Sequence, residues 1–326
     1  MTQRAMWRPN KRLKLAPRLA HRHLSFVLIV ALVTAACAKG KSPVAHRNST
    51  DTRMPPTPAK VMLATHVSLA YVDVGPRSNE VLVLLPGLSD SWRSYELVLP
   101  HLPSTFRTIV VSQRGHGDSD KPESGYTVRD FAADLNALLD ALAIRRAVIA
   151  GHSSASIVAR RFALDHPERI AGLVLEGSFV KLGEGAAQFG ARVALLEDPI
   201  SREFARDFAS ATFGRPVSKE FLDAMIEESL KAPARVWRET FASLLDYDDS
   251  AEAAKLDVRT LVVWGDKDAI IDRTATDALV RSIRDSKLVV YEGIGHTPHW
   301  EDPARFAHDV AAFVQAGGRG SPTAPR

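Results

Sequence analysis

The chain has 326 residues, 45% of them hydrophobic and 25% charged, which is typical of a globular protein with a large core and excludes a disordered or fibrous one. Its single cysteine, Cys37, excludes a disulfide framework and a cysteine-built zinc site within one chain. Ten of the 42 Lys and Arg residues lie in residues 1–50, which contain no acidic residue, so the formal net charge of +4 is no argument for nucleic-acid binding by the body of the protein.

The first 37 residues are predicted to be an export signal. Residues 1–23 are basic, residues 26–33 form an unbroken apolar run, and small residues follow at 34–36. A charged segment, a short apolar segment and small residues before a cleavage point are the parts of a secretory signal. The apolar run is too short to cross a bilayer as a helix, which takes about 20 residues.

Cys37 gives this signal a more specific interpretation. The sequence Val33-Thr34-Ala35-Ala36-Cys37 resembles the lipobox of bacterial lipoproteins, although Thr34 stands where Leu is usual. The resemblance implies that Cys37 is lipidated, becomes the mature N-terminus and anchors the protein to a membrane of the cell envelope. Residues 38–60, rich in Lys, Ser, Thr and Pro, are then a flexible linker to the body. The alternative is a secreted or periplasmic protein without a lipid.

Residues 61–316 alternate apolar runs with segments of helical period. Residues 61–74 are predicted to form an antiparallel hairpin. Unbroken apolar runs are expected where helices cover both faces of a sheet, and they predict strands at 81–85, 108–111, 147–150, 172–175 and 260–264. Apolar spacings of three and four after the capping pair Thr127 and Asp130 predict an amphipathic helix. The fold class is therefore α/β, with a doubly wound and mostly parallel sheet.

This alternation stops between about residues 179 and 254. The composition there is helical and carries no strand signal, so we interpret the stretch as a helical cap inserted into the α/β domain. Residues 317–326, rich in Gly, Ser and Pro, are predicted to be a disordered tail.

Residues 147–156 carry the first catalytic motif. A buried strand leads through Ser153 directly into a helix, which is how a serine nucleophile is made to project from a sheet. Such a turn crowds the backbone two residues to either side, and Gly151 and Ala155 supply small residues there, although Gly is the usual residue at the second position. The turn places the backbone N–H of Ser154 at a helix N-terminus, where it can donate to an oxyanion.

The other motifs resemble those of the α/β-hydrolase superfamily, and they follow in its chain order. Leu85-Pro86-Gly87-Leu88 resembles the family's oxyanion loop with Pro86 in place of the usual His, which implies that the backbone N–H of Leu88 is the second oxyanion donor. The segment from Gln113 to Pro122 resembles the family's Arg-Gly-x-Gly-x-Ser loop. His116 falls on a variable position of that loop, and we interpret it as a loop residue.

A catalytic serine needs a base, and the base needs an orienting acid. Asp268 follows a predicted strand, and His296 lies on a later loop, which completes the Ser153, Asp268, His296 order of the superfamily. His299, three residues further on, is interpreted as structural. Glu176 is an alternative acid, because it ends the strand after the elbow helix, where some members of the superfamily keep their acid.

The resemblance implies a serine hydrolase that cleaves a carboxylic ester or lactone of a hydrophobic small molecule through an acyl-enzyme, with no metal or organic cofactor. Ser153 separates the chain from epoxide hydrolases and haloalkane dehalogenases, which use an aspartate nucleophile. Cofactor-free haloperoxidases or perhydrolases and carbon–carbon bond hydrolases keep the serine and remain alternatives. So does a ligand receptor on the same fold, because a fold does not determine a function.

Overall fold

The computed structural model describes residues 56–318 except 78, 79 and 184. In this part of the chain, eight strands form one sheet in the order β1-β2-β4-β3-β5-β6-β7-β8. The strands are β1 (Ala59–Met62), β2 (Ser68–Val74), β3 (Val81–Leu85), β4 (Arg107–Val111), β5 (Ala147–His152), β6 (Ile170–Glu176), β7 (Thr260–Gly265) and β8 (Ser286–Tyr291). β1 and β2 pair antiparallel, as do β2 and β4, and all other pairs are parallel. The predicted fold class and strands are confirmed.

The continuous apolar strands arise because both faces of the sheet are covered. In β3, Val83 and Leu85 belong to the core on one face, while Leu82 and Leu84 belong to the core on the other. Side chains alternate between faces along a strand, so a strand buried on both sides must be apolar at every position. All five residues of β3 are buried.

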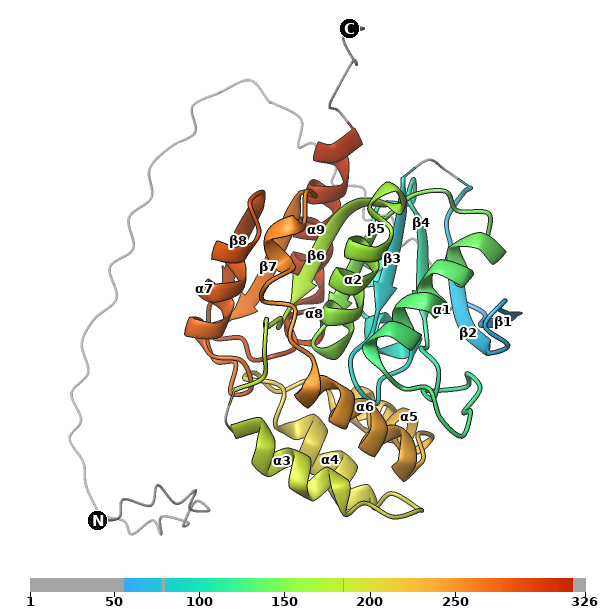
Figure 1. Cartoon of the computed structure of the whole chain (residues 1–326), viewed down its shortest axis with the longest axis vertical. Coiled ribbons are helices and arrows are strands. Elements are labelled where there is room, and N and C mark those ends of the chain that lie inside the picture. The colour runs from blue at the N-terminus through green and yellow to red at the C-terminus, as the bar shows by residue number, and fades with distance from the viewer. Residues whose placement is uncertain (1–55, 78–79, 184, 319–326) are drawn as a thin grey trace, which may run out of the picture. The chain divides into compact units, whose positions relative to one another are not determined.

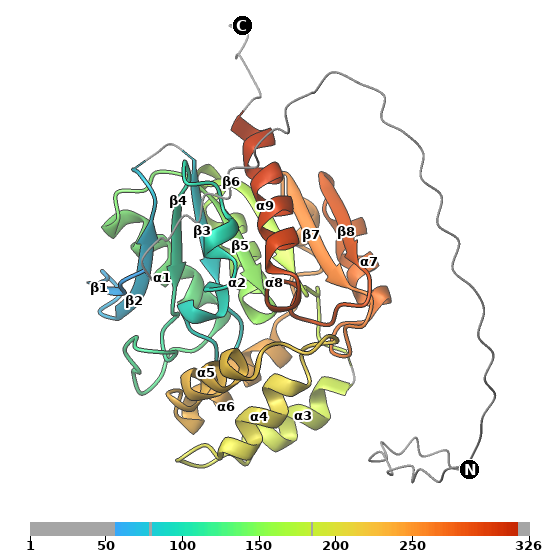
Figure 2. The same ribbon diagram turned by 180° about the vertical axis from the view of Figure 1, so that it is seen from behind.

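Helices cover the two faces separately. They are α1 (Val128–Ala141), α2 (Ser154–Asp165), α3 (Gly185–Ala194), α4 (Arg202–Ser210), α5 (Lys219–Leu230), α6 (Ala234–Asp246), α7 (Arg273–Ser282), α8 (Pro298–Glu301) and α9 (Pro303–Gly318). α1 and α2 lie in front of the sheet in Figure 1, and α9 lies in front of it in Figure 2. Thr127 and Asp130 form the predicted capping box at the start of α1.

The stretch between β6 and β7 holds four of the described helices, α3 to α6. These cap helices lie beyond the carboxyl ends of the parallel strands (Figure 1), where the ligand sites of open α/β sheets are found. Most of the cap's large apolar side chains pack among themselves: Trp237 is fully buried, and the rings of Phe204 and Phe208 meet it edge to face at 5.3 and 5.0 Å. They serve chiefly as the cap's own core.

Two boundaries differ slightly from the sequence predictions. β1 begins inside the predicted linker 38–60, because Ala59 and Lys60 pair with the backbone of β2. α9 continues to Gly318, inside the predicted tail 317–326, because Arg259 lies over the Phe313 ring at 4.1 Å and donates to the carbonyl groups of Phe313 and Val314. The predicted export signal 1–37, Cys37, most of the linker and the rest of the tail lie outside the described residues. None of the helices described is long and apolar enough to cross a membrane.

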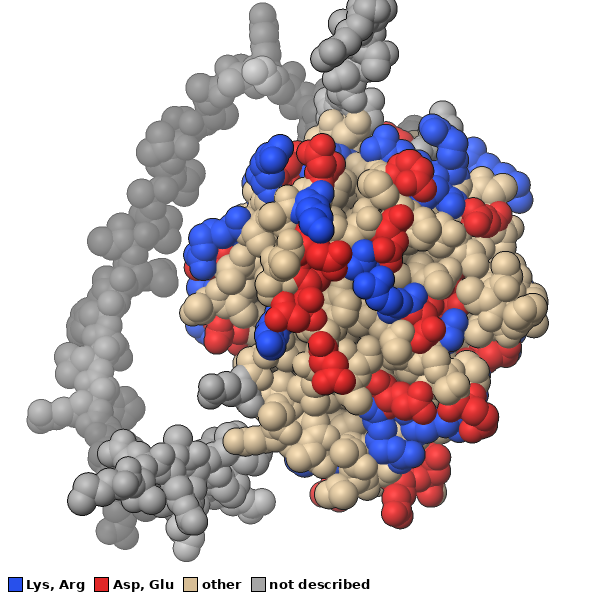
Figure 3. Space-filling view, viewed as in Figure 1, with Lys and Arg blue, Asp and Glu red and all other residues tan. Residues whose placement is uncertain are grey.

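The surface shown in Figure 3 carries both signs of charge side by side. Lys and Arg side chains alternate with Asp and Glu side chains across the α/β body on this face. Mixed charge of this kind offers no extended basic surface there for a polyanion.

Candidate active site

The turn at Ser153 is the tight strand-to-helix connection expected of a nucleophile. β5 ends at His152 and α2 begins at Ser154, which leaves Ser153 with φ of 51° and ψ of −120°. A non-glycine residue at positive φ is strained and marks sites where geometry serves function. A Cβ atom on Gly151 would lie 2.4 Å from the carbonyl oxygen of Ala155, so only glycine fits at that position. The methyl group of Ala155 fits in the core.

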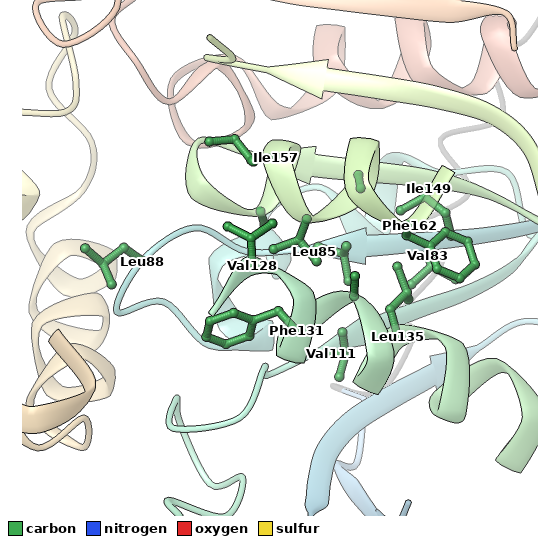
Figure 4. Packing of buried hydrophobic residues seen from close by; sticks show 14 of the residues in the cluster. Val83, Leu85, Leu88, Val111, Val128, Phe131, Leu135, Ile149, Ile157 and Phe162 are labelled. Atoms are coloured by element: carbon green, nitrogen blue, oxygen red, sulfur yellow. The ribbon is translucent and has the colours of Figure 1, made fainter. Parts of the chain in front are cut away.

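The two predicted oxyanion donors lie on neighbouring strand ends. β3 and β5 are adjacent and parallel, with Leu85 opposite Gly151, so the loops that follow them leave the same edge of the sheet. Leu88 lies on the loop beyond β3, on the side of the cap, while Leu85 lies inside the core (Figure 4). Ser154 is the first residue of α2, where a backbone N–H has no acceptor in a preceding turn. The N–H of Ser154 thus lacks an acceptor within its helix, and the oxyanion roles of Leu88 and Ser154 stay predictions.

Asp268 and His296 are joined by a hydrogen bond. Nδ1 of His296 lies 2.7 Å from Oδ2 of Asp268, and both side chains are buried. The other carboxylate oxygen of Asp268 accepts from the backbone N–H groups of Ile270 and Ile271, at 2.8 and 2.9 Å. The carboxylate is thus held in one orientation, and since it accepts from Nδ1, the lone pair of the imidazole lies on Nε2.

Nε2 of His296 is the reactive end of this pair. It is buried and has no hydrogen-bond partner among the described residues, Ser153 included. The two residues lie on adjoining segments, because Nε2 of His152, next to Ser153, donates to the carbonyl oxygen of His296 at 3.0 Å. Hydrogen bonds between a catalytic serine and its base are often long before substrate binds. The arrangement offers a half-buried hydroxyl, an unpaired imidazole nitrogen and two backbone donors at one edge of the sheet.

Known proteins are similar to this chain over most of its length. The family model of the alpha/beta hydrolase fold matches residues 80–303. The chain belongs to this family. It is 28% identical to a non-heme chloroperoxidase of Streptomyces lividans, over 76% of this chain and 96% of the relative. It is 24% identical to a 3-oxoadipate enol-lactonase of Acinetobacter baylyi, over 78% and 96%. The crystal structure of an esterase from Rhodococcus sp. ECU1013 superposes with a TM-score of 0.71 at 29% identity, over 79% of this chain and 98% of the esterase.

This alpha/beta hydrolase has a second histidine–carboxylate pair, formed by His299 and Glu176. Oε1 of Glu176 accepts from the backbone N–H of His299 at 2.9 Å and from its Nδ1 at 2.8 Å. The structure therefore pairs the alternative acid Glu176 with His299 and pairs Asp268 with His296. Burial raises the pKa of Glu176 to about 7 and lowers the pKa of His299 well below its ordinary value.

Ser94 and Asp90 close the network on the far side of His299. Ser94 Oγ lies 2.9 Å from Nε2 of His299 and 3.0 Å from Oδ2 of Asp90, and it accepts from Nε1 of Trp300 at 2.9 Å. The hydroxyl group of Ser94 has one hydrogen, which it can donate either to Nε2 of His299 or to Oδ2 of Asp90. The hydrogen of the other bond must come from another group. Burial raises the pKa of Asp90 to about 7, so its carboxyl supplies that proton in the part of the molecules in which it is protonated. Asp90 and Ser94 were not singled out from the sequence, because no spacing pattern links residues 90–94 to residue 299.

Glu301 ties the histidine loop to the cap. One of its carboxylate oxygens accepts from the backbone N–H groups of Gly214 and Arg215, and both oxygens lie within 3.1 Å of the N–H of Gly295. A Cβ atom on Gly295 would lie 2.4 Å from the nitrogen of Gly214, so the two backbones touch. The N–H of His296 donates to the carbonyl of Thr212 at 2.6 Å. The cap thus helps to hold the histidine in place.

The remaining sequence candidates have structural partners. His116 lies buried in the β4–α1 loop, as a loop residue should, and its Nδ1 is 2.7 Å from the carbonyl oxygen of Arg114. Arg114 forms a bidentate ion pair with Asp134 of α1, at 2.6 Å for each bond, and also donates to the carbonyl of Gly125. Within the described residues, no group of three or more His, Cys, Asp or Glu side chains is placed to hold a metal ion.

Proposed function

We propose that this protein is a serine hydrolase that cleaves a carboxylic ester or lactone of a hydrophobic small molecule. The observation that carries the proposal is the His296–Asp268 pair, whose Nε2 is unpaired and whose ring centroid lies 4.9 Å from that of His152, the residue before the strained Ser153. Similarity to an esterase and to an enol-lactonase supports ester or lactone chemistry. The separate pairing of Glu176 with His299 supports Asp268 as the acid.

The proposed mechanism follows from these positions. His296 Nε2 takes the hydroxyl proton of Ser153 as its oxygen attacks the acyl carbon, and Asp268 stabilises the imidazolium that forms. The N–H groups of Leu88 and Ser154 donate to the carbonyl oxygen as it becomes negative. His296 then gives the proton to the leaving alkoxide. A water molecule, deprotonated by His296, attacks the acyl-enzyme, and Ser153 regains its proton as the acid leaves.

The test uses the full-length protein and p-nitrophenyl esters from acetate to palmitate. We expect Ser153→Ala to abolish turnover and Ser210→Ala, which removes an exposed hydroxyl of α4, to leave it intact. The chain-length profile measures the size of the acyl pocket. If the wild-type protein hydrolyses no ester or lactone, or if Ser153→Ala stays active, the proposal is wrong.

A second candidate is peroxide chemistry, which the similarity to a non-heme chloroperoxidase favours. In that reaction hydrogen peroxide replaces water in the attack on the acyl-enzyme and releases a peracid. The measurement is halide oxidation in the presence of acetate and hydrogen peroxide, with Ser153→Ala beside the wild type. Serine-dependent halide oxidation that exceeds ester hydrolysis would favour this candidate.

We also propose that the protein is exported and anchored to a bacterial membrane through a lipid on Cys37. The proposal rests on the basic, acid-free N-terminus, the short apolar run and the small residues before Cys37. In a bacterial host, we expect the wild-type protein to be found in the membrane fraction and to incorporate a labelled fatty acid. Cys37→Ser should lose both properties; a Cys37→Ser protein that stays in the membrane fraction would contradict the lipid anchor.

A further inference from the structure

A small cavity lies between the cap helix α6, the helices α1 and α2 and the loop before α1, and Ser154 is among its lining residues. It is lined by Gln113, His116, Tyr126, Val128, Phe131, Ser154, Val158, Thr240, Ser243 and Leu244. Ser154 is one of the two predicted oxyanion donors, and Nε2 of Gln113 donates to the carbonyl of Pro86 in the loop that carries the other. The cavity volume of about 10 Å³ is room for a single water molecule or hydroxyl group.

Two side chains that line the cavity have polar atoms without partners. Nε2 of His116 and Oγ1 of Thr240 are both buried, and neither has a hydrogen-bond partner in the part of the chain that the structure describes. His116 is 1% exposed and Thr240 is 5% exposed. Buried polar atoms are nearly always hydrogen-bonded, because leaving one unpaired costs free energy. Two such atoms around one cavity indicate that a bound group supplies the missing bonds.

The chemistry of the two atoms restricts that group. Nδ1 of His116 must donate to the carbonyl oxygen of Arg114, 2.7 Å away, so Nε2 carries a lone pair and needs a donor. Burial lowers the pKa of His116 to about 4, which keeps the ring neutral. The hydroxyl of Thr240 can donate or accept. A carboxylate or ketone offers no hydrogen to Nε2, whereas a hydroxyl donates to Nε2 and accepts from Thr240.

The rest of the lining is mainly apolar. Val128 and Phe131 of α1, Val158 of α2 and Leu244 of α6 supply apolar side chains around this single position. Tyr126 also lines the cavity, but its hydroxyl is already used by the carbonyl of Pro122, at 2.6 Å. The cavity therefore combines hydrophobic walls with unpaired polar side chains from the β4–α1 loop and from the cap.

We propose that His116 and Thr240 form a subsite for a hydroxyl group of the substrate. This inference rests on the proposed function and narrows it: the preferred ester or lactone carries a hydroxyl on its hydrophobic part. His116 and Thr240 are specificity-determining residues, since they bind this group and take no part in the proton transfers at Ser153.

The experiment compares esters that differ by one hydroxyl group. For the acyl side the pairs are p-nitrophenyl butyrate with 3-hydroxybutyrate and hexanoate with 6-hydroxyhexanoate; for the alcohol side the pair is pentyl with 5-hydroxypentyl butyrate. In the wild type we expect kcat/KM of the hydroxylated member to exceed that of its partner by about tenfold or more in at least one pair, because the unsubstituted ester leaves two buried polar atoms unpaired.

Two variants and a control decide the assignment. Thr240→Val keeps the shape of the side chain and removes the hydroxyl, and His116→Phe removes the acceptor; each should bring the ratio to about one or below. Ser229→Ala removes a buried, unpaired hydroxyl elsewhere in the cap and should keep the wild-type ratio. If His116→Phe does not fold, Thr240→Val decides alone. A wild-type ratio near one in every pair, or an unchanged ratio in Thr240→Val, would show that the cavity takes only water.

Binding to the Ser153→Ala protein separates this inference from the proposed function. Calorimetry with the same ester pairs needs no turnover, and we expect tighter binding of a hydroxylated member that Thr240→Val abolishes. If this preference is present but the wild type hydrolyses nothing, the proposed function is wrong and the subsite stands. If the wild type hydrolyses esters through Ser153 without any preference in binding or turnover, the subsite is wrong and the proposed function stands.

Discussion

The structure contains two histidine–carboxylate pairs, His296 with Asp268 and His299 with Glu176, whose histidines are three residues apart in the chain. The two pairs differ in the partner of the histidine Nε2 atom. Both join Nδ1 to a carboxylate, at 2.7 and 2.8 Å, and all four side chains are buried. Nε2 of His299 lies 2.9 Å from Oγ of Ser94, whereas Nε2 of His296 has no partner in the described structure. A buried pair of this kind therefore points to catalysis only when its outer nitrogen is free to take a proton.

The largest expected effect separates the two carboxylates. Asp268→Asn should lower kcat for ester hydrolysis by about 10⁴-fold, because the amide no longer holds the imidazole in its correct tautomer. Glu176→Gln should have a far smaller effect, since its Oε1 can still accept from His299. Ester hydrolysis by the two variants is the measurement. Near-wild-type activity of Asp268→Asn together with an inactive Glu176→Gln would exchange their roles.

The next effect is on stability and separates the two histidines. His299→Ala should lower the free energy of unfolding by about 3 kcal/mol, because it leaves Glu176 and Ser94 buried with fewer partners. His296→Ala should lower it less, since Asp268 keeps two backbone N–H donors. Urea unfolding measures both values. A lower free energy of unfolding for His296→Ala than for His299→Ala would contradict this prediction.

The pH dependence of stability sharpens the comparison. The pKa of Glu176 is raised from 4.5 to about 7 on folding, so the folded state binds the proton more tightly than the unfolded state does. Stability from this group is therefore full below pH 4.5 and is lost as the pH rises to about 7. Glu176→Gln has no carboxyl to ionise at this position. As the pH rises from 4.5 to about 7, the free energy of unfolding of Glu176→Gln should therefore increase relative to that of the wild type, by at most about 3 kcal/mol. A pH-independent difference in urea midpoints would contradict the raised pKa.

The smallest expected effect comes from removing the Ser94 hydroxyl group, which lies against Nε2 of His299. Ser94→Ala frees Nε2 of His299 and should lower stability by about 1–2 kcal/mol through lost hydrogen bonds. It should not restore ester hydrolysis to His296→Ala, because Nδ1 of His299 stays bonded to Glu176 and its ring stays stacked on Tyr95 at 4.5 Å. Unfolding and activity assays of the single and double variants test both statements. Restored activity in the double variant would mean that an open Nε2 alone is enough.

The sheet and the order of Ser153, Asp268 and His296 could be predicted because local patterns carry them. Apolar runs mark strands buried on both faces, and Gly151 is required by a contact within its own turn. The structure brings Asp268 to His296, while the roles of these residues stay predictions. Ser94 could not be found in this way, because its partner His299 lies 205 residues along the chain and only packing joins them; Asp90 joins the network through Ser94.

The cavity beside Ser154 also could not be predicted from sequence motifs. His116 was interpreted from the sequence as a loop residue, and its backbone does lie in a loop. That it lines a cavity together with Thr240 depends on α6 of the cap, which packs opposite that loop. A motif describes one segment, so it does not report what a distant segment places opposite to it.

The contacts of Glu301 have a consequence for exchanging parts between relatives. Because this carboxylate bonds the backbones of Gly214, Arg215 and Gly295 together, the segment around residues 212–215 belongs to the histidine loop although it lies within the cap. A chimera that takes a foreign cap must keep these residues and join the new sequence outside them. Caps grafted in this way would change the surface over the sheet's carboxyl edge while keeping the backbone contacts that hold His296.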